Sequence, residues 1–443
     1  MVARQGSVAV IGAGIAGLTA AYRLKQAGYQ PVVFEACDYP GGRIKSIRRN
    51  GMIFDVGAFI YLGSYQQSID LIREVGLDAQ LGRFDAYGAM PRDGALHFLD
   101  FKKPLRTILG TSYLSAASKL KALKLFRFLA ANWKHLNYED VRGVAAIDTE
   151  SVRSYCEREL NPELLDYLAT VVVRGPWLVN ADTASIAQLL WTMKNFFKPY
   201  FYGLDDGMDA LPRALAATLD VRLSQPVHEV LTHGEQVELG WTDAQGQSRR
   251  ERFDACINTV TADRVLAMCP QVTGVQREFF ASTRYVSSVN THLALSREPE
   301  NPAAYIMVSP RESENLSGVI VDHKKARGRV PAGKGMLTVF CRHEWCVENL
   351  DTPDQQVIDQ VLGFIKPYYG DLRATLEDFE IGRWPQVVAF MGKGRFRQMA
   401  AYQQACDPRA PLQFANDLLP IGGVNAALVS GDHAARRVMS RLS

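Results

Sequence analysis

Residues 7–17 read SVAVIGAGIAG, and they carry more information about the fold than any other segment of the chain. Ser7–Ile11 is a short apolar run with β-branched residues, which predicts a buried strand. A G-x-G-x-x-G turn follows, and Leu18–Ala27 then has the composition of a helix that ends at Gly28. Pro31–Phe34 predicts a second strand, which ends in Glu35. The segment is therefore expected to form a βαβ unit.

The residue types in this unit suit a dinucleotide. Gly12 permits a tight turn, Gly14 lets the backbone approach a pyrophosphate, and Gly17 lets the helix pack on the sheet. The helix N-terminus offers backbone N–H groups to the phosphates, and these belong to the residues at its start, Ile15 and Ala16. A glycine-rich turn in an ordinary α/β sheet is the alternative, but it gives the third glycine no purpose.

Glu35 supports the same interpretation. It stands at the end of the second strand, 18 residues after the last glycine of the motif. An acid at this place can accept hydrogen bonds from the hydroxyls of a ribose. Turn, helix, strand and acid together predict a dinucleotide-binding site.

Composition limits the remaining possibilities. The chain has 443 residues, 47% apolar and 22% charged, which are ordinary globular values and exclude a disordered or fibrous protein. Its 50 basic and 47 acidic residues give a net charge of +3, too balanced to indicate a nucleic-acid partner. The seven cysteines lack CxxC spacing, so we expect no disulfide framework and no metal site. No targeting or membrane-spanning segment is evident, and a cytoplasmic location is expected.

Two further motifs identify the dinucleotide. Gly41-Gly42-Arg43 follows the acid by six residues, and Phe54-Asp55-Val56-Gly57-Ala58 comes next. With them the sequence resembles the FAD-dependent superfamily of amine oxidases, protoporphyrinogen oxidases and carotenoid desaturases. The resemblance implies that Gly42 and Arg43 meet the phosphate and ribityl region of FAD. It also implies that Asp55, Gly57 and Ala58 lie beside the isoalloxazine ring.

The resemblance continues to the end of the chain. The segment 203–230 is similar to the family's central motif, and it gives Val227 the role of clamping the adenine. Residues 412–435 are similar to the family's C-terminal motif, in which Asp417 binds ribityl hydroxyls and pyrophosphate. Val424 opens the final helix, where its N–H can meet flavin O2. No cysteine falls where some relatives attach the cofactor, so non-covalent FAD is expected.

The same reasoning predicts an α/β fold with two discontinuous parts. A Rossmann-like FAD-binding domain is expected over 1–95, 203–285 and 385–443. A substrate domain is expected over 96–202, which has mainly helical patterns, and 286–384, which has strand patterns with one helix at 354–366.

Candidate pocket residues come from segments near the flavin motifs. Those expected are Phe59, Tyr61, Thr291, Trp384, Phe390 and Met391, with Trp177 and Tyr202 as weaker candidates. Many amine oxidases carry a lysine near flavin N5 on a strand similar to 287–291. By that local match this chain has Thr291, which disfavours a standard amine oxidase.

The sequence leaves three functions open. The leading hypothesis is dehydrogenation or desaturation of a largely apolar, cyclic or isoprenoid-like molecule by hydride transfer to FAD, with electrons passing to oxygen or a quinone. An amine or amino-acid oxidase is the second, and a non-redox isomerase or mutase is the third. Residues 101–134 hold eight basic residues and no acid. This segment is either a solvated core helix, the lining of a substrate entrance, or a peripheral contact with the inner membrane surface.

Overall fold

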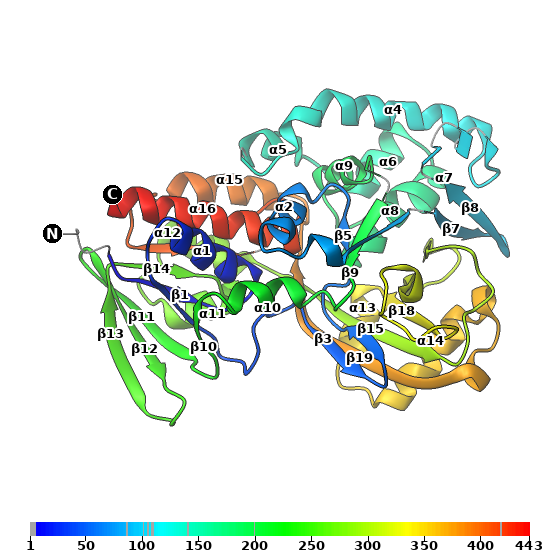
Figure 1. Ribbon diagram of the computed structural model, residues 1–443. Helices are drawn as coiled ribbons and strands as arrows, with labels where there is room; N and C mark the ends of the chain where they lie inside the picture. The colour runs from blue at the N-terminus through cyan, green and yellow to red at the C-terminus, as the bar shows by residue number, and fades with distance from the viewer. Residues whose placement is uncertain are drawn as a thin grey trace.

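The computed structural model describes residues 6–85, 87–100, 102–103, 106–107, 110–139, 141–198, 200–416 and 419–443. Figure 1 shows two lobes, and the chain passes between them several times. One lobe contains a parallel sheet with flanking helices, and the other contains a large mixed sheet below a layer of helices. The fold is α/β with a Rossmann-like domain, as expected.

The parallel sheet collects strands from both ends of the chain. Its order is β10 (Asp220–Arg222), β2 (Pro31–Phe34), β1 (Val8–Ile11), β14 (Ala255–Asn258) and β20 (Leu412–Phe414). All four pairings are parallel. Because β1 pairs with both β2 and β14, the glycine turn that follows β1 lies at the centre of the carboxyl edge, where open α/β sheets bind ligands.

Helices cover this sheet, and two of them, α1 (Ile15–Gln26) and α16 (Val424–Leu442), pack against each other. The others in this lobe are α2 (Gln66–Glu74), α10 (Ala210–Ala216), α11 (Ala262–Met268), α12 (Gly274–Ser282) and α15 (Arg395–Ala405). An antiparallel sheet of β11 (Val227–His233), β12 (Gln236–Thr242) and β13 (Ser248–Phe253) packs beside them.

The second lobe is built on a seven-stranded sheet. Its order is β19 (Leu376–Ala389), β15 (Tyr285–Leu295), β18 (Gly335–Cys341), β17 (Leu316–Val321), β16 (Tyr305–Met307), β7 (Tyr87–Arg92) and β8 (Ala95–Asp100). Val289, Leu293 and Leu337 on this sheet share a core with Val357 and Val361 of α14 (Asp354–Tyr369). α13 (His343–Glu348) lies next to β15.

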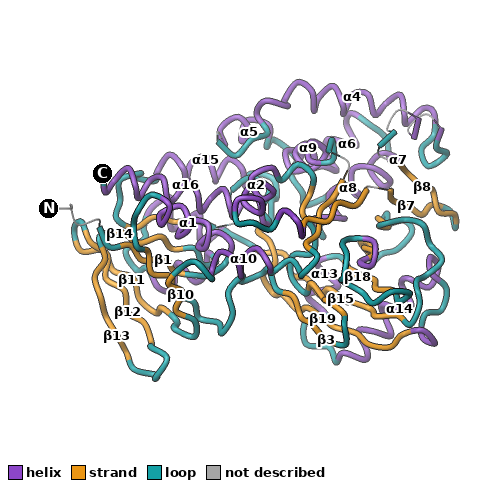
Figure 2. The backbone as a smooth tube through the Cα atoms, in the orientation of Figure 1, coloured by secondary structure: helices purple, strands orange, loops and turns teal. Residues whose placement is uncertain are grey.

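A helical layer completes the second lobe, and Figure 2 shows it as a group of helices above the sheet. It consists of α4 (Ala116–Asn132), α5 (Val141–Ile147), α6 (Val152–Glu159), α7 (Pro162–Leu164), α8 (Thr170–Trp177) and α9 (Ile186–Asn195). One π-helical turn, 165–169, joins α7 to α8. None of the helices in the described part of the chain is long and apolar enough to cross a bilayer.

Two small sheets connect the lobes. The hairpin of β3 (Ser46–Arg49) and β4 (Met52–Asp55) is one, and the other has the order β5 (Tyr61–Leu62), β9 (Tyr200–Leu204), β6 (Leu81–Asp85). β4 leads directly into the segment 56–60, which therefore sits where the two lobes meet.

Strand pairing moves one expected domain boundary. Residues 87–95 were assigned to the FAD-binding part, but β7 pairs with β16 of the seven-stranded sheet. Residues 96–100 were expected in a helical region, but they pair with β7 as β8. Pro91 and Gly88 obscure the strand pattern of β7. The Asp93-Gly94 turn, with φ of +52° and +79°, is the hairpin signal that marks this pair.

Candidate functional site

A cavity of about 970 Å³ lies between the lobes. Its lining comes from the carboxyl edge of the parallel sheet, from segment 56–60, from α8 and from the seven-stranded sheet. Most of the residues that the sequence assigned to FAD and some of those assigned to the substrate therefore line one space.

The glycine turn forms one end of the cavity. Gly12 has φ +98°, a conformation that favours glycine, and its N–H donates to the Phe34 carbonyl at 2.7 Å. A Cβ at Gly14 would meet nothing within 4 Å, so this backbone is open to a ligand. A Cβ at Gly17 would lie 2.0 Å from the Gly12 carbonyl oxygen, so Gly17 permits the turn rather than lining the cavity.

The first turn of α1 faces this opening. Gly14 is its N-cap, and no side chain caps the helix. The first N–H groups of a helix have no partner within the helix, and its dipole favours an anion there. Ile15 and Ala16 line the cavity. The arrangement suits a pyrophosphate, as the sequence predicted.

Glu35 lies at the cavity with its carboxylate held in place. Oε2 accepts a hydrogen bond from the Ala13 N–H at 2.7 Å, and Oε1 accepts one from the Cys37 N–H at 2.9 Å. Each oxygen keeps a further lone pair for a ribose hydroxyl. The backbone thus orients the acid before any ligand binds.

The Gly-Gly-Arg motif and the segment after β4 are joined by close backbone contacts. Ala58 N–H donates to the Arg43 carbonyl at 2.9 Å, and a Cβ at Gly57 would lie 2.0 Å from the same oxygen. Gly42, Arg43, Gly57 and Ala58 all line the cavity. Arg43 Nη1 also donates to the Val387 carbonyl at 3.0 Å, which fixes the guanidinium at the cavity wall.

The C-terminal helix contributes a second helix N-terminus. Gly423 precedes α16 with φ +103°, no side chain caps this helix, and Val424 lines the cavity. Val227 lines it as well, at the start of β11. Asp417, the expected ribityl-binding acid, lies outside the described residues.

Two charged residues at the cavity were not anticipated. Asp263 and Arg264 belong to the first turn of α11, just after β14. Burial acts to raise the pKa of Asp263, but hydrogen bonds from Thr261 and Gln386 leave that pKa below its usual range. The sequence signal for Asp263 and Arg264 was their position just after a central strand, because the carboxyl edge of such a sheet binds ligands.

Asp55 does not line the cavity, which corrects the role that the resemblance gave it. Its carboxylate is fully buried, 2.8 Å from Lys325 Nζ and paired with Arg329. Ser46 Oγ donates to it at 2.6 Å and the Met208 N–H at 3.0 Å. Burial opposes the charge on Asp55, yet the two cations hold its pKa well below the usual range. Asp55 thus fixes the start of segment 56–60 without lining the cavity itself.

The ion cluster around Asp55 extends to β15. Lys325 Nζ also lies 2.8 Å from Asp322, and Asp322 accepts a hydrogen bond from Thr338 Oγ1 at 2.5 Å. Since that hydroxyl donates to Asp322, it accepts from His292 Nδ1 at 2.8 Å. Burial lowers the pKa of His292 to about 4, so the imidazole is neutral at pH 7.

The cavity beyond the dinucleotide end is apolar, and we call it the substrate chamber. Its lining is aromatic and aliphatic, with two polar side chains from β15. The chamber is lined by Phe59, Ile60, Leu62, Tyr65, Gly175, Pro176, Trp177, Leu178, Phe196, Phe201, Ser288, Asn290, Tyr305, Met307, Ile320, Phe340 and Trp384. Phe59 and Phe340 stack with ring centroids 5.8 Å apart and form a flat apolar wall.

The charged side chains of the cavity come from segments that follow strands of the parallel sheet, and from β11. Among the described lining residues, the acids and bases are Glu35, Arg43, Asp263 and Arg264, with His228 near the adenine end. No described lining residue is a lysine. The described residues of the chamber therefore offer no countercharge to a ligand, and an unpaired buried charge is costly.

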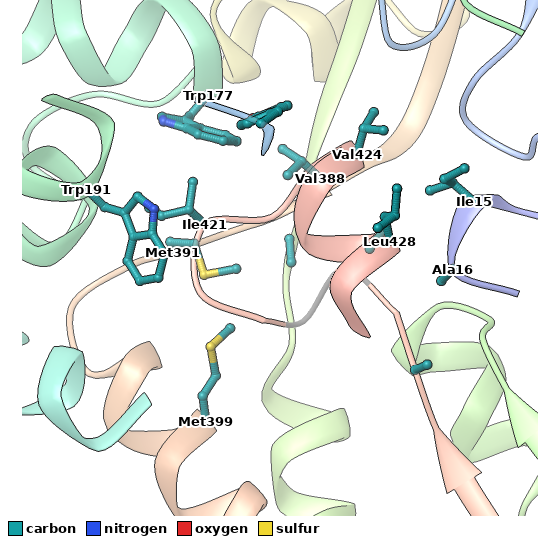
Figure 3. Packing of buried hydrophobic residues seen from close by; sticks show 14 of the residues in the cluster. Ile15, Ala16, Trp177, Trp191, Val388, Met391, Met399, Ile421, Val424 and Leu428 are labelled. Atoms are coloured by element: carbon teal, nitrogen blue, oxygen red, sulfur yellow. The ribbon is translucent and has the colours of Figure 1, made fainter. Parts of the chain in front are cut away.

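The pocket residues expected from sequence separate into two groups. Phe59, Trp384 and Trp177 line the chamber, and Trp384 Nε1 donates to the Val56 carbonyl at 2.6 Å. Tyr61, Tyr202, Thr291, Phe390 and Met391 do not line it. Figure 3 shows Met391 packed near Ile421 and Trp191, in the core instead.

Strand geometry explains the misplacement of Thr291. Side chains alternate along a strand, and β15 turns Ser288 and Asn290 toward the chamber. Thr291 therefore faces the other side of the sheet. Correct alternation across 287–291 would have selected residues 288 and 290.

These features fit FAD. An uncapped helix start beside an open glycine suits a pyrophosphate, the oriented acid suits a ribose, and the arginine suits the phosphate and ribityl region. The start of α16 at Val424 adds a second uncapped helix N-terminus to the lining of the cavity.

Comparisons with known proteins agree with the site. The model of the family described as flavin containing amine oxidoreductase matches residues 15–439. Protoporphyrinogen oxidase 2 of Arabidopsis thaliana is 32% identical over 201 residues, which cover 44% of this chain and only 38% of that protein. Coproporphyrinogen III oxidase of Mycobacterium bovis is 25% identical over 98% of both chains.

A solved structure shows the same fold. Cyclohexylamine oxidase from Brevibacterium oxydans superposes with a TM-score of 0.78, at 14% identity and over 99% of both chains. Because the family model covers most of the chain and the cavity carries the cofactor motifs, this protein belongs to the flavin containing amine oxidoreductase family.

Proposed function

We propose that the protein dehydrogenates or desaturates an uncharged, largely apolar molecule with a cyclic or isoprenoid-like skeleton. The observation that carries this proposal is the substrate chamber, where no described lining residue is charged. Amine substrates are cationic at neutral pH, and porphyrinogens carry carboxylates. The described chamber residues offer no countercharge to either group, which favours a neutral substrate.

The residues of the chamber position the substrate and exclude water from it. Phe59, Phe340 and Trp384 present apolar surface from three segments that lie beside the flavin motifs. When bound, FAD supplies the electron sink, taking two electrons from the substrate as a hydride. The chain then needs only to hold a C–H bond in place and to exclude water. Oxygen or a quinone is the proposed final acceptor.

Anaerobic titration of the FAD-loaded protein tests this proposal. The panel contains neutral cyclic terpenoids and polyenes, primary amines and polyamines, amino acids, and porphyrinogens. We expect neutral compounds alone to bleach the visible absorbance of the flavin, because they alone reduce it. Bleaching by amines alone would establish the amine oxidase alternative. Conversion of a neutral compound with no net use of an acceptor would establish the isomerase alternative.

A further inference from the structure

One face of β15 carries two buried polar side chains into the substrate chamber. Ser288 and Asn290 share this face because side chains alternate along a strand, and both line the chamber. They are 1% and 2% exposed. Val289, between them, packs into the core on the opposite side of the sheet.

The hydrogen bonds of Asn290 leave part of its amide unused. Ser288 Oγ donates to Asn290 Oδ1 at 2.6 Å. Asn290 Nδ2 donates to the Gly57 carbonyl over 3.5 Å, at the limit of a hydrogen bond. A carboxamide has two N–H donors and two lone pairs on oxygen. Among the described residues, the second N–H and the second lone pair have no partner, so both can bind a ligand in the chamber.

Other polar atoms of the chamber are engaged or directed elsewhere. Trp177 Nε1 donates to Thr192 Oγ1 at 2.8 Å. The Tyr305 hydroxyl lies against Gly88, where a Cβ would be 2.7 Å from it. The Tyr65 hydroxyl is near Gly423, at the cofactor end. The Asn290 amide is thus the hydrogen-bonding group that β15 offers to a ligand in the chamber.

We propose that Asn290, held in orientation by Ser288, binds an oxygen atom of an otherwise apolar substrate, either a ketone or a hydroxyl. The second N–H donates to that oxygen, and the second lone pair accepts from it if it is a hydroxyl. Since Asn290 contacts Gly57, at the segment that leads past the expected flavin ring, an oxygen held there determines which carbon of the substrate approaches the cofactor. This inference rests on the proposed function, because it requires a neutral ligand.

A matched pair of probes tests the inference. Carvone and limonene are neutral cyclic isoprenoids with one skeleton, and only carvone has a carbonyl oxygen. Their dissociation constants are measured on the FAD-loaded protein by perturbation of the flavin spectrum, and on the same samples by quenching of tryptophan fluorescence. The variants are Asn290→Leu, of similar size without hydrogen bonds, and Ser288→Ala, which retains the amide. Thr291→Val, on the opposite face of the same strand, is the control.

The native protein is expected to bind carvone about tenfold more tightly than limonene, the effect of one hydrogen bond of ordinary strength. Asn290→Leu should remove this preference and leave limonene binding unchanged. Ser288→Ala should reduce the preference, and Thr291→Val should retain it. The melting temperature of each variant shows that it is folded.

Other results would overturn the inference. Equal binding of both probes by the native protein, or a preference retained in Asn290→Leu, rejects it and leaves the proposed function standing. A flavin spectrum altered by Asn290→Leu without any probe would mean that the amide serves the cofactor. If neither probe binds, the neutral chamber and the proposed function fail together with the inference.

Discussion

Glu35 is the residue where local sequence and cofactor binding are most directly linked. Its carboxylate is oriented by the N–H groups of Ala13 and Cys37. We expect Glu35→Ala to weaken FAD binding roughly 10- to 100-fold, because hydrogen bonds to a charged group contribute about 1.5–3 kcal/mol. Equilibrium dialysis of the apoprotein with FAD measures the change. Asp38→Asn, a nearby acid that does not line the cavity, is the control. Unchanged affinity in Glu35→Ala would place the ribose elsewhere.

The lowered pKa of the buried His292 predicts that the free energy of unfolding depends on pH. In the folded protein its pKa is lowered to about 4, whereas the unfolded chain binds a proton near the ordinary value of 6.5. Between these values the unfolded state holds more protons, so stability falls as the pH falls. The loss attributable to His292 at pH 5 is about 2 kcal/mol.

Urea unfolding at pH 7.5 and pH 5 measures this dependence. His292→Gln retains a donor for Thr338 but does not titrate, so the difference between the two pH values should shrink by about 2 kcal/mol. His228→Gln, on the exposed side of β11, is the comparison. An undiminished difference in His292→Gln would assign the acid sensitivity to other groups.

At the scale of elements, the contact between α1 and α16 depends on a glycine. A Cβ at Gly431 would lie 2.1 Å from the Ala16 carbonyl oxygen, and neither backbone can move without shifting its helix. Gly431→Ala is expected to destabilise the protein by roughly 1–3 kcal/mol. Gly363, inside α14, has open space around it, and Gly363→Ala should stabilise by about 0.5–1 kcal/mol. Melting temperatures should therefore shift in opposite directions. An unchanged or higher melting temperature for Gly431→Ala would refute close packing at Gly431.

The basic helix α4 has both a buried and an exposed apolar side. Leu125 and Leu129 are buried in the core, whereas Leu120 and Leu123 are 70% and 54% exposed. Arg127 is also exposed. We propose that this outward side contacts an anionic membrane surface, since exposed leucines beside basic groups suit such a contact.

Sedimentation with phosphatidylglycerol vesicles tests the proposed contact. The double variant Leu120→Gln and Leu123→Gln should bind about tenfold more weakly, because it loses part of the apolar burial of two side chains. Val275→Gln, which replaces an exposed apolar residue far along the chain, is the control. Equal binding to neutral phosphatidylcholine vesicles would exclude the role of the basic groups.

At the scale of the whole molecule, FAD is expected to be held by both lobes without a covalent bond. Cys37 is the cysteine among the described lining residues, and it lies beside Glu35, at the ribose end rather than the ring end. Acid precipitation should therefore release all of the flavin into the supernatant. FAD at 100 times its dissociation constant should also stabilise the fold by about 2.7 kcal/mol. Flavin that stays with the precipitate would show a covalent link.

The sequence by itself determined the dinucleotide end of this protein. A strand, three spaced glycines, a helix and an acid are contiguous, so residues 8–35 specify their geometry by local turns and hydrogen bonds. Val424 is likewise marked by the start of its helix, and Gly42 and Arg43 lie in a turn whose motif is contiguous in the sequence. Local signals of this kind need no knowledge of distant contacts.

Tertiary structure alone decided the substrate chamber and the place of Asp55. Asp55 has two cationic partners that are distant in the chain. Lys325 is 270 residues away, and Arg329 is 274 residues away. Asn290 reaches the chamber, and Thr291 does not, because pairing with β18 and β19 determines which side chains of β15 point toward it. A one-residue change of facing moves a side chain to the other side of a sheet. Burial and pairing across such separations arise only when the whole chain folds.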